Sequence, residues 1–303
     1  YWDEFVPDLE EMNLKNKNVW ITGAASGIGA AVAIECRRRG ANVILSAHRE
    51  ARHQENRYND FDHEILLWRM LSTEGPRIVK GDVNGDQRED FVLLGAKDDE
   101  DKLFVQQAGG TFRRKPSEGL AMGKSFESSS GAFLDADQDG DLDLMLASGG
   151  NEYLEGGQHF ILRYFENDGD GNLTPGSRNA PQLVGNFSCL ETADFNNDGS
   201  TDLFLGGRCV PGNYGLPPRS FLMSRQGGTW VDVTPQALAG IGMVTDAAWA
   251  DVDGDQDQDL VVVGEWMGIH VFRNQNNGAF YDTEIPNSRG WWNRVEAADL
   301  DGD

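Results

Sequence analysis

The sequence has too few basic residues to attract an anionic polymer. Its 303 residues include 26 Lys and Arg against 50 Asp and Glu, which gives a formal net charge of −24 at neutral pH. Nucleic-acid binding needs clustered Lys and Arg that neutralise phosphates, and binding to an anionic membrane surface depends on the same side chains. The composition therefore argues against nucleic acid and anionic lipid headgroups as partners.

Cysteine and long apolar runs are also scarce. Three Cys cannot build the dense disulfide framework of a small secreted domain. Apolar stretches such as residues 261–263 end at Gly264, far short of the roughly 18 residues that a membrane-spanning helix requires. We expect no membrane insertion. Glycine, in contrast, is abundant with 37 residues, which indicates many tight turns.

Residues 1–52 differ from the rest of the chain because their acidic and basic side chains balance, so the acidity lies in residues 53–303. Residues 19–22 predict a strand, residues 23–29 a glycine-rich turn, residues 28–39 a helix and residues 42–47 a second strand. Small residues at such a turn let a pyrophosphate approach the unpaired N–H groups of a helix amino terminus.

The TGxxxGxG spacing of this turn resembles the first βαβ unit of the short-chain dehydrogenase/reductase family, over residues 12–50. The resemblance implies a dinucleotide site formed by Gly23, Ser26, Gly27, Gly29 and, for a 2′-phosphate, Arg49. No Tyr is followed four residues later by the Lys of the family's catalytic pair. We interpret residues 1–52 as a truncated Rossmann-like fragment, either a fusion or an assembly artefact, and do not expect NAD(P) to bind.

A nine-residue acidic pattern recurs in residues 53–303. Its copies begin at Asp82, Asp135, Asp194, Asp251 and Asp299. Gly occupies the sixth position of the second and third copies, whereas Gln87 and Gln256 replace it in the first and fourth, where a left-handed backbone would cost them roughly 1–2 kcal/mol. One copy about every 50–60 residues predicts one supersecondary unit per repeat.

Oxygen-bearing side chains at alternate positions predict a calcium site in each copy. Hard cations take six to eight oxygens at about 2.3–2.6 Å, and position 7 adds a backbone carbonyl. An EF-hand is excluded because its bidentate Glu at position 12 is Leu or Val here. The candidate ligand positions are Asp82, Asn84, Asp86, Arg88 and Asp90; Asp135, Asp137, Asp139, Asp141 and Asp143; Asp194, Asn196, Asp198, Ser200 and Asp202; Asp251, Asp253, Asp255, Asp257 and Asp259; and Asp299, Asp301 and Asp303.

Each acidic segment is followed by an apolar β-type run and then by a strand, a Gly/Asn turn and a strand. The apolar runs are residues 91–94, 142–146, 203–205 and 260–263, and the predicted hairpins are residues 103–112, 164–173, 221–230 and 271–280. Residues 131–134 and 247–250 predict one more strand before the acidic segment. Four strands per repeat are typical of a β-propeller blade.

These repeats resemble the FG-GAP/VCBS-type family, the calcium-bearing β-propeller of integrin α-subunit heads and many secreted bacterial proteins. We therefore predict a mainly β fold: residues 53–303 form a partial, open β-propeller of about four to five four-stranded blades, incomplete at the C-terminus. A small N-terminal α/β Rossmann-like βαβ fragment precedes it. The resemblance implies one structural Ca²⁺ per complete repeat and an adhesion or ligand-recognition role, extracellular or at the cell surface, toward a protein or carbohydrate.

Several alternatives stay open at this point. The dinucleotide motif alone would indicate a cytoplasmic NAD(P)-dependent oxidoreductase, and a polysaccharide-active enzyme built on a propeller is a third class for which no catalytic residue can be nominated. A metal-free acidic turn is disfavoured because packed carboxylates repel one another. Cys189 and Cys209 flank the third acidic segment and form either a disulfide or two buried thiols. We expect Trp249, Trp291 and Trp292 in the core or at a blade edge rather than at a sugar platform.

Overall fold

The computed structural model describes residues 18–22, 42–46, 58–75, 77–153, 157–275 and 278–298. The chain divides into two compact units, one of residues 1–54 with 108–110 and one of residues 55–107 with 111–303. Among the described residues, no helix has both the length and the apolar character needed to cross a bilayer.

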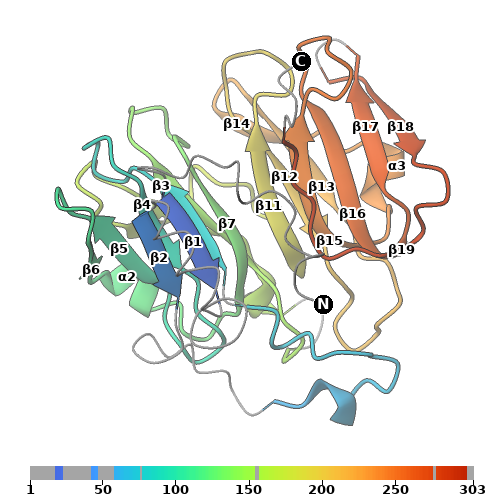
Figure 1. Ribbon diagram of the computed structural model, residues 1–303, viewed down its shortest axis with the longest axis horizontal. Coiled ribbons are helices and arrows are strands. Elements are labelled where there is room, and N and C mark those ends of the chain that lie inside the picture. Colours follow the sequence, from blue (N-terminus) through green and yellow to red (C-terminus); the bar gives the residue numbers. More distant parts are fainter. Residues whose placement is uncertain are drawn as a thin grey trace, which may run out of the picture. The chain divides into compact units, whose positions relative to one another are not determined.

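The smaller unit contains a two-stranded parallel sheet of β1 (Asn18–Thr22) and β2 (Asn42–Ser46) (Figure 1). Both strands lie where the sequence predicts them. Parallel pairing requires a crossover connection, as the predicted βαβ order supplies. The predicted turn and helix lie outside the described residues, as do the candidate dinucleotide ligands Gly23, Ser26, Gly27, Gly29 and Arg49.

The larger unit contains four antiparallel sheets in its described part, each with four strands in chain order, which we call blades 1 to 4 (Figure 1). Blade 1 consists of β3 (Ile78–Gly81), β4 (Asp90–Leu93), β5 (Lys102–Gln106) and β6 (Phe112–Lys115). Blade 2 consists of β7 (Ser128–Leu134), β8 (Asp143–Ser148), β9 (Arg163–Glu166) and β10 (Thr174–Gly176).

Blade 3 consists of β11 (Phe187–Ala193), β12 (Asp202–Gly207), β13 (Phe221–Gln226) and β14 (Thr229–Asp232). Blade 4 consists of β15 (Met243–Ala250), β16 (Asp259–Met267), β17 (His270–Asn274) and β18 (Phe280–Glu284), with β19 (Gly290–Trp291) paired to β16. The short helices are η1 (Asp60–Asp62), α2 (Glu118–Ala121), η2 (Gln158–Phe160) and α3 (Gln236–Ala239).

The first strand of each blade lies beside the first strand of the next, in the series β3, β7, β11 and β15. The second strands β4, β8 and β12 are buried along their whole length. Three apolar clusters fill the spaces between successive blades, centred on residues such as Leu144, Leu203 and Val262. The structure is therefore mainly β and has the open, propeller-like repeat architecture that the sequence predicts.

Residues 58–75, which we call the crossing segment, precede blade 1 in the chain but pack against blades 3 and 4. Its Leu67 and Leu71 form an apolar cluster with Cys209, Tyr214 and Met243. Within the segment, Ser72 donates from its backbone N–H and its hydroxyl to the buried Asp60 carboxylate, at 3.2 and 2.6 Å. The segment therefore links distant repeats.

The alternatives for cysteine are resolved in favour of thiols. Cys189 and Cys209 are both buried and free. Burial raises the pKa of each thiol to about 12, so neither is a reactive thiolate at neutral pH.

Candidate metal centre

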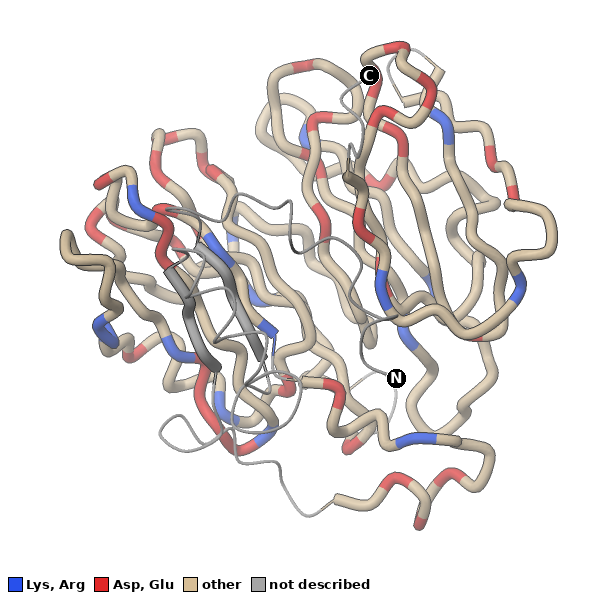
Figure 2. Tube along the Cα trace, in the orientation of Figure 1, with Lys and Arg blue, Asp and Glu red and all other residues tan. Residues whose placement is uncertain are grey.

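The four described acidic loops join the first and second strands of their blades and therefore lie at the same end of every blade. We number them loops 1 to 4; they begin at Asp82, Asp135, Asp194 and Asp251. Figure 2 shows Asp and Glu gathered on loops at the upper edge of the view. The fifth copy, with Asp299, Asp301 and Asp303, lies outside the described residues.

Each loop is turned by two residues with a left-handed backbone, at positions 4 and 6. These residues are Gly85 and Gln87, Gln138 and Gly140, Asn197 and Gly199, and Gly254 and Gln256, with φ between 56° and 100°. Gln87 and Gln256 thus have the left-handed backbone that is costly for a Gln side chain. Every loop contains one Gly in this pair: the loops without Gly at position 6 have Gly at position 4.

This backbone wraps around the carboxylate at position 1. In loop 2, Asp135 accepts hydrogen bonds from the N–H groups of Asp139 and Gly140 at 3.1 and 3.2 Å. The carboxylate at position 5 then accepts from the N–H group of position 7, for example Asp139 from Asp141 at 3.1 Å. The other three loops repeat all three bonds, with Asp82, Asp194 and Asp251 at position 1.

The side chains at positions 1, 3 and 5 converge. In loop 2, one oxygen from each of Asp135, Asp137 and Asp139 lies within 4.8 Å of the others. Asp251, Asp253 and Asp255 converge in the same way in loop 4. Oxygens on opposite sides of a calcium ion are about 4.6–5.2 Å apart, because each lies at about 2.3–2.6 Å from the metal. The spacing therefore fits a hard divalent cation.

Two further carboxylate oxygens are buried without a hydrogen-bond donor, Oδ1 of Asp141 and Oδ2 of Asp202. Burial and the neighbouring carboxylates, Asp139 first, raise the pKa of Asp141 to about 6. Burial also raises the pKa of Asp202 to about 6. Crowded carboxylates with raised pKa values need a nearby positive charge to ionise readily, so the donor set suits a bound cation.

The carboxylates at position 9 form a different kind of contact. Asp90, Asp143 and Asp259 are fully buried. In each, one oxygen accepts from the N–H group at position 2, and the other accepts from an N–H group in the third strand of the blade or directly after it. Asp202 makes only the second bond, from Arg225 N–H at 2.8 Å. Position 9 thus fastens the loop to its blade, a role that alternate spacing does not reveal.

Cations of the protein lie beside carboxylates of two loops: Arg88 in loop 1, and Arg273, whose guanidinium is 3.9 Å from Asp253 of loop 4. The Arg88 guanidinium donates to the Asp86 carboxylate and to the carbonyl oxygen of Gln106, the latter at 3.1 Å. The Arg88 side chain therefore competes with a metal for Asp86. Its side chain is no metal donor, and only its backbone carbonyl fits the role expected at position 7.

Sequence reasoning missed two asparagines that join neighbouring loops. The Asn167 amide donates to the carbonyls of Val83 in loop 1 and Leu142 in loop 2, both at 2.9 Å. Asn274 donates to the carbonyls of Phe195 and Gln258 at 2.6 and 3.3 Å, joining loops 3 and 4. Each follows a Phe by two residues at the end of a predicted hairpin strand, and this repeated Phe-x-Asn pattern was the available signal.

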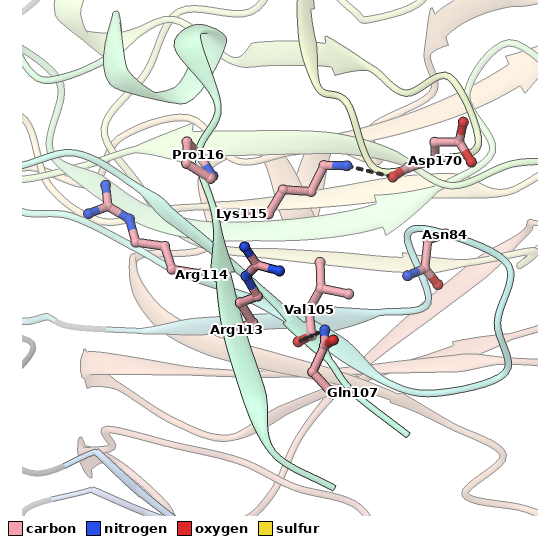
Figure 3. Close-up of a pocket in the computed structure, with 8 residues that line it drawn as sticks. All are labelled: Asn84, Val105, Gln107, Arg113, Arg114, Lys115, Pro116 and Asp170. Carbon is pink, nitrogen blue, oxygen red and sulfur yellow. Dashed lines mark hydrogen bonds between the residues drawn. The ribbon is translucent and has the colours of Figure 1, made fainter. Parts of the chain in front are cut away.

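A groove of about 260 Å³ beside loop 1 is lined by three consecutive basic residues (Figure 3). Asn84 of loop 1 and Arg113, Arg114 and Lys115 of β6 line it. Lys115 donates to the carbonyl of Asp170 on the blade 2 hairpin at 2.8 Å. These cations lie on an exposed edge strand, where charge discourages pairing with another chain.

Comparisons with known proteins give two unequal resemblances. A 44-residue stretch is 52% identical to 11-beta-hydroxysteroid dehydrogenase B of Sesamum indicum, covering 14% of this chain and 12% of that protein. The chain thus spans about an eighth of that relative.

Among solved structures, the V. cholerae biofilm matrix protein Bap1 is 16% identical with a TM-score of 0.34, over 70% of this chain and 30% of that one. A chain in a complex of RAG with one melted and one unmelted RSS is 15% identical with a TM-score of 0.41, over 72% of this chain and 69% of that one. The family model described as FG-GAP-like repeat matches residues 82–146, 135–205 and 251–303, more than half of the chain. These matches contain all the acidic loops, and the chain belongs to the FG-GAP-like repeat family.

Proposed function

We propose that residues 53–303 are a calcium-stabilised propeller module that recognises a ligand outside the cell, and that residues 1–52 are a separate, truncated unit. The observation that carries the proposal is the convergence of three carboxylate oxygens within 4.8 Å in loops 2 and 4. Family membership supports the same function. No described residue is assigned a catalytic role.

Bound calcium would supply the positive charge that these loops lack. The protein supplies the ligands: side-chain oxygens at positions 1, 3 and 5, and a backbone carbonyl at position 7. The buried position 9 carboxylate holds the loop against its blade, and the two left-handed residues aim the alternate oxygens inward. Each ion would then stabilise the connection between the first two strands of a blade, so that metal binding and folding are coupled.

The test is a thermal melt of the full chain in calcium and in a calcium chelator, combined with calorimetric calcium titration. We expect the chelator to lower Tm and each intact loop to take up one ion. The double variant Asp137→Asn, Asp139→Asn should lose one ion and part of the calcium-dependent shift. Glu166→Gln is the matched control, because Glu166 is exposed on β9 outside the loops. Equal melting temperatures with and without chelator would reject the proposal.

A second candidate function is dinucleotide binding by the smaller unit. The 52% identical match and the parallel pairing of β1 with β2 favour it. Titration with NADPH, followed by quenching of tryptophan fluorescence, tests it on the full chain. Saturable quenching that Gly27→Val abolishes would support a functional nucleotide site, and a flat titration would reject it.

A further inference from the structure

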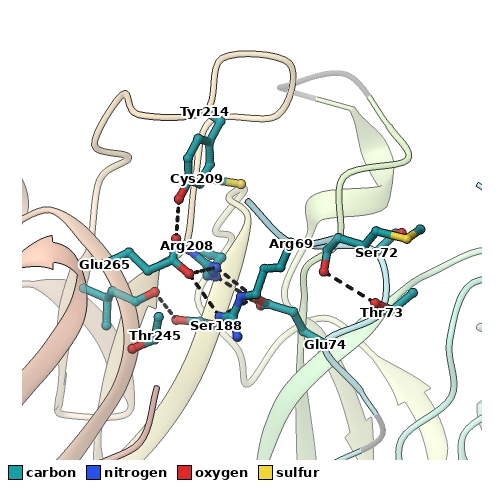
Figure 4. A network of polar contacts seen from close by, with 12 residues as sticks. Arg69, Ser72, Thr73, Glu74, Ser188, Arg208, Cys209, Tyr214, Thr245 and Glu265 are labelled. Carbon is teal, nitrogen blue, oxygen red and sulfur yellow. Dashed lines mark hydrogen bonds and ion pairs between the residues drawn. The ribbon is translucent and has the colours of Figure 1, made fainter. Parts of the chain in front are cut away.

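The end of blades 3 and 4 opposite the acidic loops carries a buried network of arginine and glutamate (Figure 4). Arg208, which is only 3% exposed, donates to both oxygens of Glu74 at 3.0 and 2.8 Å and to Glu265 at 2.9 Å. Arg69 lies 2.9 Å from Glu74 and 3.0 Å from Glu265. The Tyr214 hydroxyl donates to the second oxygen of Glu265 at 2.6 Å. Both glutamates are therefore fully partnered.

A cavity of about 310 Å³ adjoins this network and contains a third arginine with a different environment. Its lining includes three arginines, one carboxylate and two neutral polar side chains: Arg69, Arg77, Arg294, Glu74, Thr245 and Asn293. Arg294 pairs with Asp246 at 3.2 Å. Arg77 donates to the carbonyl of Ser188, and among the described residues no carboxylate oxygen lies within 4.0 Å of its guanidinium.

Arg77 is thus a buried cation that makes no ion pair within 4.0 Å, although the carboxylates of Asp246 and Glu74 lie near enough to attract it. Burial, and then repulsion by Arg294, lower the pKa of its guanidinium below the ordinary value. Removing a charge from water without a counter-ion is costly, whereas a guanidinium and a carboxylate form a strong bidentate pair. The cavity lining therefore carries an excess of positive charge, three arginines against the Glu74 carboxylate, which suits an anion.

An exposed aromatic surface lies next to the cavity. The side chains of Trp68, Trp266 and Trp291 are 43%, 61% and 45% exposed. Trp68 stacks on Trp291 with ring centroids 4.8 Å apart, and Trp266 meets Trp291 edge to face at the same distance. The Arg69 guanidinium, which lines the cavity, lies 5.0 Å from the centre of the Trp68 ring. Contiguous exposed aromatic surface of this kind marks an interaction site.

The backbone of Trp266 is strained. Its φ is 61°, in the left-handed region that bulky side chains rarely adopt, and it stands where the pairing of β16 with β19 shifts register. The indole N–H donates to the Tyr214 hydroxyl at 3.2 Å, which ties the ring to the network. A bulge can re-aim a side chain, and strain that is retained in a fold concentrates at functional sites.

We propose that this end of the propeller binds a carboxylate-bearing saccharide, with the carboxylate on Arg77 and the apolar face of a sugar ring against Trp266. The inference rests on the proposed ligand-recognition function and specifies its ligand. Indole rings match the flat C–H faces of a pyranose, and Thr245 and Asn293 supply polar groups for hydroxyls. A volume of 310 Å³ is at the lower end of the range of about 300–1,000 Å³ for small-molecule pockets, which suits one or two sugar units.

The test uses the full chain in calcium and titrates it calorimetrically with tetragalacturonate and with its methyl ester. The ester keeps the rings and removes the charges, so this comparison needs no variant. We expect the ester to bind at least tenfold more weakly. Arg77→Gln and Trp266→Ala should each weaken tetragalacturonate binding at least tenfold. Tyr281→Ala, at an aromatic residue that is 67% exposed on β18, should change the affinity less than twofold.

Equal binding of the acid and its ester, or no binding of either, would overturn the proposal, as would wild-type affinity in Trp266→Ala. Tetraglutamate provides the peptide arm: if it binds as tightly as tetragalacturonate and Trp266→Ala leaves its affinity unchanged, the site is a peptide site. Melting curves in calcium and chelator are recorded for every variant. A melting temperature that depends on calcium, without saccharide binding, would contradict this inference and leave the proposed function intact.

Discussion

The two ends of the blades differ in how their charges are compensated. At the loop end, the carboxylates of residues 135–143 have no basic side chain as an ion-pair partner in the described part of the chain. At the opposite end, Glu74 and Glu265 both pair with Arg69 and Arg208, whereas Arg77 makes no ion pair with a described residue. The same strands connect both ends. The contrast indicates that loop 2 is built to receive a cation and that the opposite end is largely neutralised internally, with capacity for an anion.

Removing Arg208, which neutralises the glutamates at the end opposite the loops, should cause the largest loss of stability. Arg208→Ala leaves Glu265, whose side chain is 0% exposed, with one cation fewer, and it removes both bonds to Glu74. We expect a loss of about 3–5 kcal/mol in the free energy of unfolding, since breaking a buried ion pair leaves an uncompensated charge. Urea denaturation at neutral pH measures it. A loss below about 1 kcal/mol would show that the network is not a stabilising element of the fold.

The acidic loops should contain two kinds of carboxylate: one stabilises the fold with or without calcium, and the other does so only when calcium is present. Asp259→Asn replaces one of two carboxylate oxygens, each of which accepts a different N–H group, by an NH2 group that cannot accept. The change should cost about 2–3 kcal/mol with calcium or with chelator. The exposed Asp253→Asn should cost stability only when calcium is present. Urea denaturation in both buffers compares them, and an identical calcium dependence for the two variants would contradict the separate roles.

The stability of the fold should depend on pH because of a carboxyl group on β11, the first strand of blade 3. Burial, and then the neighbouring Asp246 carboxylate, raise the pKa of Glu191 on β11 to about 7, above its ordinary value of about 4.5. The folded state therefore holds a proton that the unfolded chain releases, so stability falls as the pH rises from about 5 to 8.

Glu191→Gln should remove this dependence, because the amide stays neutral. We expect the variant to gain about 1–2 kcal/mol at pH 8 and almost nothing at pH 5, relative to the unsubstituted chain. Thermal denaturation across this pH range measures the gain. The reverse order, with a larger gain at pH 5, would show that Glu191 is ionised in the folded state.

The smallest effect should come from the loop backbone. Gln256 has φ of 73°, so Gln256→Gly should relieve a left-handed conformation and stabilise the protein by about 1 kcal/mol. Gln258→Gly is the control in the same loop, since Gln258 is absent from the positive-φ residues, and there glycine should lower stability. Chemical denaturation of both variants in calcium tests the pair, and a destabilising Gln256→Gly would refute the strain argument.

Much of the fold could be predicted because its signals are local and repeated. The apolar runs and Gly/Asn turns predict the second, third and fourth strands, and the first strand was recognised in only two repeats. β3 and β11 were not predicted from the sequence. Their buried and exposed residues do not alternate regularly, or polar side chains interrupt their apolar residues. The convergence of positions 1, 3 and 5 also follows from spacing, since a turning loop brings alternate side chains together.

The remaining features depend on contacts between residues far apart in the chain. The link from Asn167 to Val83 spans two blades, and the cluster of Trp68, Trp266 and Trp291 joins the crossing segment to blade 4. No local sequence pattern encodes contacts between residues so far apart in the chain. Trp291 on the edge strand β19 became part of an exposed surface only because the crossing segment brings Trp68 beside it.

The amino-acid sequence by itself determined the repeat, the strand-rich blades and the acidic loops, because alternation and turn chemistry act over a few neighbouring residues. Only the tertiary structure decided which carboxylates face a common centre, which are buried and hydrogen-bonded to their blade, and that Arg77 makes no ion pair with a described residue. Those outcomes depend on burial and on distances between blades, and electrostatic free energies in proteins vary most strongly with these two quantities.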